Sequence, residues 1–82
     1  MTNVNILGKI KKIDDETYIQ VERQYKTNYG EYIYDDLPCI YWNRQKKNIF
    51  TSLKEGIMVF VKGRLECKEN KMYIIVEEFI AF

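Results

Sequence analysis

The sequence contains no histidine, two cysteines and one proline among its 82 residues. Cys39 and Cys67 lie far apart and form no C-x-x-C pair, so the sequence has no pattern of a zinc site. We expect both cysteines to be small buried side chains in a reducing compartment. The sequence therefore predicts neither a cofactor nor a metal site.

Long apolar runs are also missing. The longest, from Ile57 to Val61, is far shorter than the roughly 20 residues of a membrane-spanning helix, and no signal-peptide pattern opens the chain. These absences predict a soluble, cytoplasmic protein with no membrane partner. The net charge is only +1, from 13 basic and 12 acidic residues, so any affinity for nucleic acid must come from the local arrangement of charge.

Tyrosine is abundant. Seven of the aromatic residues are tyrosine, four are phenylalanine and one is tryptophan. Tyrosine tolerates exposure, so this excess indicates a contact surface. The length predicts one domain, residues 1–82. A chain this short buries only about 60% of its unfolded surface, so we expect a homo-oligomer, either a dimer or a tetramer.

Alternation of apolar and polar residues predicts five strands, at 3–13, 17–25, 32–42, 57–65 and 72–80. Gly8 indicates a bend in the first strand. The third strand should be interrupted at residues 35–38, because Pro38 cannot donate a hydrogen bond to a neighbouring strand. Turns are expected at 14–16, 26–31 and 69–71.

A short helix is predicted from Arg44 to Leu53, with Asn43 as its N-cap and Gly56 ending the following turn. Its apolar stripe consists of Ile49, Phe50 and Leu53. Five strands with one helix between the third and fourth predict an all-β protein, the five-stranded Greek-key barrel called the OB-fold. The helix should plug one end of this barrel.

The two faces of the fourth strand differ in chemistry. One face is apolar and should enter the core: Ile57, Val59, Val61 and Leu65. The other combines an aromatic ring with cations: Met58, Phe60, Lys62 and Arg64. An exposed phenylalanine indicates a ligand or a partner subunit.

Several different short motifs follow one another along the chain: VNILGKI at 4–10, VER at 21–23, Tyr25, GE at 30–31, CIYW at 39–42, Asn48, Leu53, Lys54, Gly56, and V-x-V-x-GRL at 59–65. In this order they resemble the bacterial single-stranded DNA-binding protein family, which has Val-Asn-Arg, Cys-Val-Val-Trp and Val-x-Val-x-Gly-Arg-Leu at the matching places. The resemblance implies an OB-fold that binds single-stranded DNA without sequence preference, during replication, recombination or repair. It implies no enzymatic activity.

Two departures from the family stand out. The chain stops at Phe82 without the acidic tail that recruits replication proteins, and the connection at 69–71 is short. We therefore expect a minimal version with a small DNA site, serving a bacterium, phage or plasmid. The short length is also similar to primosomal protein N, so an adaptor that acts through protein contacts stays open. Glu22, Glu66, Glu77 and Glu78 favour that alternative.

Binding of single strands requires aromatic faces for the bases and cations for the phosphates. The predicted site comprises Trp42, Phe60, Tyr25, Tyr29, Tyr32, Tyr34, Arg23, Lys26, Arg44, Lys62, Arg64, Lys9 and Lys11. Trp42 is the first candidate for stacking, with a core position as its alternative.

Other interpretations of this site remain. Phe60 is either a stacking ring or an oligomer contact, the tyrosines either bind or pair across strands, and Lys9 and Lys11 either bind or protect an edge. The apolar residues 79–82 indicate a subunit interface or a chain end folded onto its own barrel. RNA remains an alternative to DNA.

An enzyme is the remaining rival. A metal-dependent nuclease on this fold needs clustered carboxylates, and the sequence has two clusters, at 14–16 and 35–36. Both lie in predicted turns, where acidic residues are common. We therefore expect no catalysis.

Overall fold

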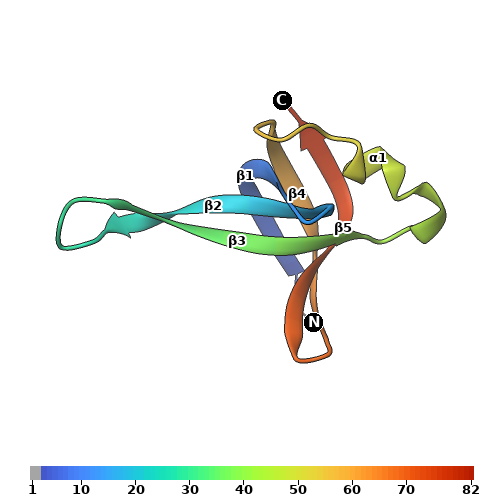
Figure 1. Ribbon diagram of the computed structural model, residues 1–82. Coiled ribbons are helices and arrows are strands. Elements are labelled where there is room, and N and C mark those ends of the chain that lie inside the picture. The colour runs from blue at the N-terminus through green and yellow to red at the C-terminus, as the bar shows by residue number, and fades with distance from the viewer. Residues whose placement is uncertain (1–2) are drawn as a thin grey trace.

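Five strands close into a barrel in the computed structural model, which describes residues 3–82 (Figure 1). The elements are β1 (Asn3–Ile13), β2 (Glu16–Lys26), β3 (Tyr32–Tyr41), the 3-10 turn η1 (Arg44–Lys46), α1 (Asn48–Thr51), β4 (Met58–Lys68) and β5 (Lys71–Ala81). Around the barrel the strands follow the order β1-β2-β3-β5-β4, and only β3 and β5 are parallel. This is the predicted OB-fold.

Strand β1 pairs with two neighbours in succession. Asn3 to Lys9 pair with β4, and Lys9 to Ile13 pair with β2. Gly8 lies at this change of partner, where a Cβ atom would be 2.5 Å from Ile19 Cγ2 and 2.6 Å from the Gln20 carbonyl oxygen. The predicted bend is confirmed, and the close approach of β2 explains why glycine stands there.

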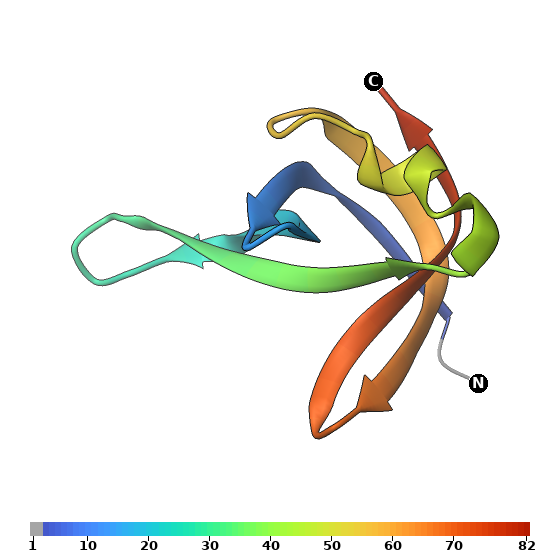
Figure 2. The same ribbon diagram turned by 45° about the vertical axis from the view of Figure 1, so that its right-hand side comes forward.

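The core lies inside the barrel. Its fully buried members are Ile10, Ile19, Phe50, Val59, Val61, Ile74 and Val76. Phe50 comes from α1 and stacks against Tyr41, with ring centroids 6.4 Å apart, and meets Phe79 edge-on at 5.2 Å. Burial of one such ring contributes about 1.5–3 kcal/mol. Figure 2 shows the helical segment crossing from the end of β3 over one end of the barrel.

The predicted helix from Arg44 to Leu53 is wrong in its extent. The Asn43 side chain is an N-cap, because it accepts a hydrogen bond from the Gln45 N–H at 3.1 Å. However, the element that it caps is the 3-10 turn η1, and only the single helical turn α1 follows. Ile49 is 50% exposed, although we expected it in the apolar stripe. Successive helical residues point about 100° apart, so within the single turn α1 only Phe50 is buried, while Leu53, two residues after α1, packs partly buried against the core.

Strand β3 is not interrupted at Asp35 to Pro38, contrary to the prediction. All four residues pair with β2, and Pro38 is the last to do so. Cys39 is the first residue paired with β5. The missing N–H of Pro38 therefore falls where β3 changes partners, so the strand tolerates it.

The two cysteines differ in environment. Cys39 is half-buried, and burial raises the pKa of its thiol to about 12. Cys67 is exposed, so the prediction that both are buried is wrong for this residue. It lies near the end of the β4–β5 hairpin, where its register partner Met72 is itself exposed.

Gly63 provides a test of the barrel's closure. The β4–β5 register shifts between Lys62 and Gly63, and a Cβ at Gly63 would overlap the Ile75 carbonyl oxygen. We expect Gly63→Ala to lower the free energy of unfolding in urea by at least about 3 kcal/mol. The control Gly30→Ala has open space around it and a positive φ of 78°, so it should cost only about 1–2 kcal/mol. Equal losses would contradict the close packing of β4 on β5.

Candidate nucleic-acid interface

The β2–β3 hairpin extends well beyond the barrel (Figure 1), and we call residues 22–34 the finger. Its pairing slips between Glu22, which opposes Tyr34, and Lys26, which opposes Tyr32. Thr27 orders the tip, since its Oγ1 accepts hydrogen bonds from the N–H groups of Tyr29 and Glu31 at 3.3 and 3.1 Å. Gly30 supplies the positive φ that this turn needs. The predicted turn is thus a hydrogen-bonded loop.

Four tyrosine rings of the finger are exposed. Tyr25, Tyr32 and Tyr34 are more than half exposed, and Tyr29 at the tip is 90% exposed. Within residues 3–82 none of these rings contacts another ring; instead Lys26 Nζ lies 4.4 Å above the Tyr32 ring and the Arg23 guanidinium 5.8 Å from Tyr25. The finger therefore carries rings interleaved with cations, as predicted, and the alternative of cross-strand tyrosine pairing is not observed.

Trp42 stands at the opposite end of β3. Its backbone N–H donates to the Val76 carbonyl oxygen at 2.9 Å, while the residue is 55% exposed and its ring is tilted against Tyr41. This exposure excludes the core position left open by the sequence. Tyr32 and Tyr34 have the same parity along β3, so they share its outer face, and Trp42 continues this parity one residue beyond the end of the strand. Trp42 is eight positions from Tyr34 in the sequence, or roughly 26 Å of extended chain.

Three of the predicted cations are occupied by carboxylates. Arg23 holds Asp35 through two hydrogen bonds of 2.8 Å, and Lys11 pairs with Asp36 at 2.9 Å. Arg64 contacts both Glu66, at 2.7 Å, and Glu77, at 3.0 Å. The bonds from Arg23 lower the pKa of Asp35, and the bond to Glu66 is the main cause of a raised Arg64 pKa. A phosphate would have to displace these partners.

The other four predicted cations have no carboxylate partner among residues 3–82: Lys9, Lys26, Arg44 and Lys62. Lys26 is on the finger, Arg44 follows Trp42 by two positions, and Lys9 lies on β1 opposite Gln20 of β2. Three cations without a carboxylate partner in that range, Lys9, Lys26 and Arg44, thus accompany Trp42 and the exposed tyrosines of β2 and β3.

Phe60 and Lys62 belong to a different surface. Register places Leu7, Phe60 and Ile80 side by side on the outside of β1, β4 and β5. Ile80 is 61% exposed, and Phe82 and Leu7 are also exposed, whereas Phe60 is half-buried. We call Leu7, Phe60, Ile80 and Phe82 the apolar face. Beside it, Lys62 lies opposite Glu78 in the β4–β5 register without forming an ion pair. The structure does not bring Phe60 together with Trp42 and the tyrosines.

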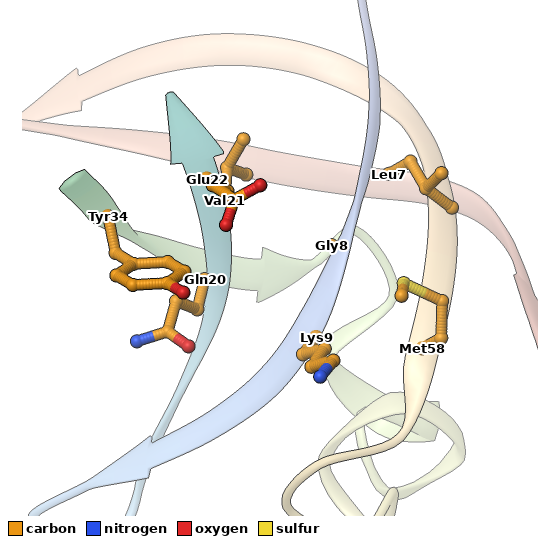
Figure 3. Close-up of a pocket in the computed structure, with 8 residues that line it drawn as sticks. All are labelled: Leu7, Gly8, Lys9, Gln20, Val21, Glu22, Tyr34 and Met58. Atoms are coloured by element: carbon orange, nitrogen blue, oxygen red, sulfur yellow. The ribbon is translucent and has the colours of Figure 1, made fainter. Parts of the chain in front are cut away.

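Sequence reasoning missed a hollow of about 410 Å³ at the base of the finger (Figure 3). It lies between β1 and β2 and is lined by Leu7, Gly8, Lys9, Gln20, Val21, Glu22, Tyr34 and Met58. Partial desolvation and the Glu22 carboxylate raise the pKa of the Tyr34 hydroxyl. Only Gly8, which marks the bend in β1, hinted at this feature in the sequence.

The acidic clusters do not form one site. Asp35 and Asp36 point to opposite sides of β3, the first toward Arg23 and the second toward Lys11. Within the described part of the chain no group of three or more cysteine or carboxylate side chains is arranged to hold a metal ion. Among the same residues no helix is long and apolar enough to cross a membrane.

Known proteins resemble this barrel in sequence and in fold. The chain is 28% identical to the single-stranded DNA-binding protein of Bacillus cereus, over 83% of its own length and 46% of the relative, and 28% identical over the same shares to that of Bacillus anthracis. It is 26% identical to single-stranded DNA-binding protein 3 of Streptococcus agalactiae, over 99% of its own length and 70% of the relative. No family model matches.

Among solved structures, the chain superposes on the single-stranded DNA-binding protein of Plasmodium falciparum in complex with single-stranded DNA. The TM-score is 0.65 with 13% identity, over 100% of this chain and 95% of that one. This likeness shows a shared fold. The chain spans about half the length of the Bacillus relatives it matches. It is thus an OB barrel similar to single-stranded DNA-binding proteins.

The Arg23–Asp35 pair decides whether Arg23 is available to a phosphate. We expect a carboxyl-carbon NMR titration to give Asp35 a pKa below the usual value of about 3.9, because the carboxylate accepts hydrogen bonds from Arg23. The stabilisation from this pair is present at neutral pH and is lost as the pH falls through the lowered pKa. Arg23→Gln should raise this pKa, whereas Arg44→Gln should not. An ordinary pKa for Asp35 in the unmodified protein would mean that Arg23 is free.

Proposed function

We propose that this protein binds single-stranded DNA on the outer face of β1, β2 and β3, with the finger folding over the strand. The observation that carries the proposal is the set of exposed rings at the two ends of β3: Tyr32 and Tyr34 at its start, and Trp42 directly after its last residue. Lys9, Lys26 and Arg44, which have no carboxylate partner within residues 3–82, lie on the neighbouring elements. Bases stack on such rings at about 1–3 kcal/mol each, whatever their identity.

The likeness to proteins named for single-stranded DNA binding supports this proposal, as does the solved neighbour in complex with single-stranded DNA. Binding changes no covalent bond of the DNA, and it serves replication, recombination or repair in the cytoplasm of a bacterial cell or its mobile elements. The proposed site also includes the exposed finger residues Tyr25 and Tyr29. Arg23, Lys11 and Arg64 should contribute less to phosphate binding, because carboxylates already hold them.

We propose a second copy of this chain as the cover of the apolar face. Leu7, Ile80 and Phe82 are each more than half exposed, and a contiguous apolar patch marks an interaction surface. Lys62 lies opposite Glu78 in the register, so a two-fold axis there places each charge near its opposite in the other copy. Phe60 and Lys62 would then serve assembly, while Trp42 and the tyrosines stay open for DNA.

Trp42 is the only tryptophan, so its fluorescence reports one position. We expect oligo(dT) to quench it, and Trp42→Ala to weaken binding of labelled oligo(dT) by about 1–3 kcal/mol with little change in melting temperature, because the ring is 55% exposed. The matched control is Ile49→Ala, which removes a side chain of similar exposure from the neighbouring turn and should not alter affinity. Unchanged affinity in Trp42→Ala would reject this residue as a stacking platform.

The salt dependence of binding separates free from occupied cations. We expect Lys9→Gln, Lys26→Gln and Arg44→Gln each to reduce the slope of log K against log salt by about 0.7, the value for one phosphate contact on a single strand. Arg64→Gln should reduce the slope much less, because Glu66 and Glu77 already neutralise Arg64 and a phosphate must compete with them. An equal reduction in Arg64→Gln would show that ion pairing does not govern which cations bind.

The apolar face predicts assembly. Light scattering should give the unmodified protein a mass of at least two chains, and Ile80→Glu should reduce it to one, because a buried unpaired carboxylate opposes association. Ile49→Glu, an equal change outside the face, should leave the mass unaltered. A single-chain mass for the unmodified protein would refute this interface.

A further inference from the structure

The hollow at the base of the finger results from the barrel's closure. β1 and β2 are paired only between Lys9–Ile13 of β1 and Glu16–Gln20 of β2. The part of β1 that precedes Lys9 pairs with β4, and the part of β2 that follows Gln20 pairs with β3 and leads into the finger. The two strands diverge there, and their side chains line a space of about 410 Å³. This lies within the range of small-molecule sites, roughly 300–1,000 Å³.

Its walls suit a flat, partly polar ring. Figure 3 shows Tyr34, Gln20 and Glu22 on one side of the space, with Leu7 and Met58 on the other. Gly8 adds no side chain between them. An aromatic face opposite aliphatic side chains is the environment in which nucleobases stack.

The polar groups of the hollow are available to a ligand. Lys9 has no carboxylate partner within residues 3–82, and Gln20 makes only a long hydrogen bond of 3.4 Å to Asp36. Glu22 forms no ion pair in this part of the chain, and its contact with the Tyr34 hydroxyl leaves further lone pairs on the carboxylate. The hollow therefore offers one anionic acceptor, one amide and one cation.

This set of groups discriminates among ligands. The Glu22 carboxylate repels a free anion. A wholly apolar ligand would leave the side chains of Lys9, Gln20 and Glu22 without hydrogen-bond partners. A base with an exocyclic amino group matches the carboxylate, since Glu accepts readily from the amino group of cytosine. Thymine and uracil instead present carbonyl oxygens on either side of one N–H, and these repel a carboxylate.

We propose that the hollow is a nucleobase subsite that prefers a base carrying an amino group, of which cytosine is the smallest. The base lies against Tyr34, Glu22 accepts from its amino group, and Lys9 binds an adjacent phosphate. This inference rests on the proposed function and adds a base preference to it. A protein that is otherwise indifferent to sequence would then favour cytosine at one position of its track.

The test compares oligo(dC) with oligo(dU) of equal length at fixed salt, because cytosine and uracil differ at the position of the amino group. We expect the unmodified protein to bind oligo(dC) more tightly, by roughly three- to tenfold, as one charge-assisted hydrogen bond open to solvent provides. Glu22→Gln should remove this preference, because its amide can turn to serve either base. The control Glu31→Gln removes the same charge from the exposed finger tip and should retain it.

The outcomes separate the two proposals. Equal binding of the two oligomers by the unmodified protein would overturn the base subsite while leaving single-strand binding intact. A Glu22→Gln variant that binds both more tightly but keeps the ratio would also overturn it, because Glu22 would then act only by repelling phosphates. Failure to bind either oligomer would instead refute the proposed function.

Discussion

One strand serving two neighbours is the constraint on which this barrel depends. β1 pairs with β4 along its first half and with β2 along its second, and the change at Gly8 and Lys9 requires a backbone without a side chain. Without that bend the sheet would stay open and Ile10, Val59 and Val76 would lose their common interior. The same bend separates β1 from β2 and so creates the hollow beneath Tyr34.

Ion pairing selects the cations that remain available on a nearly neutral molecule. The net charge of +1 provides little general attraction for a polyanion. Carboxylates on β3, β4 and β5 hold Lys11, Arg23 and Arg64, and they leave Lys9, Lys26 and Arg44 free beside the exposed rings. Affinity for phosphate on such a surface depends on a few local charges, and it therefore falls with added salt.

The exposed aromatic residues divide between two faces of the barrel. Those of β3, the finger and the segment directly after β3 are tyrosine and tryptophan, whose polar atoms can keep contact with water while the rings remain exposed. Those on the apolar face lie among Leu7 and Ile80 and include phenylalanine, which has no polar atom. The first arrangement suits a solvated, exchangeable polynucleotide, and the second suits a permanent protein partner.

The sequence alone determined the five strands in their order along the chain, the glycine bend, the Asn43 cap and the tyrosine-rich hairpin. Alternation, turn residues and caps act between neighbours in the chain. It could not determine the single-turn helix, the uninterrupted β3, the exposure of Cys67 and Ile49, or the separation of Phe60 from Trp42. Each of these depends on which strands meet across the barrel. Ion pairs such as Arg23–Asp35 and Lys11–Asp36 join residues 12 and 25 positions apart, and the hollow needs β1 and β2 to diverge in space. Only the closed tertiary structure brings such distant groups together, since local sequence carries no record of register between strands.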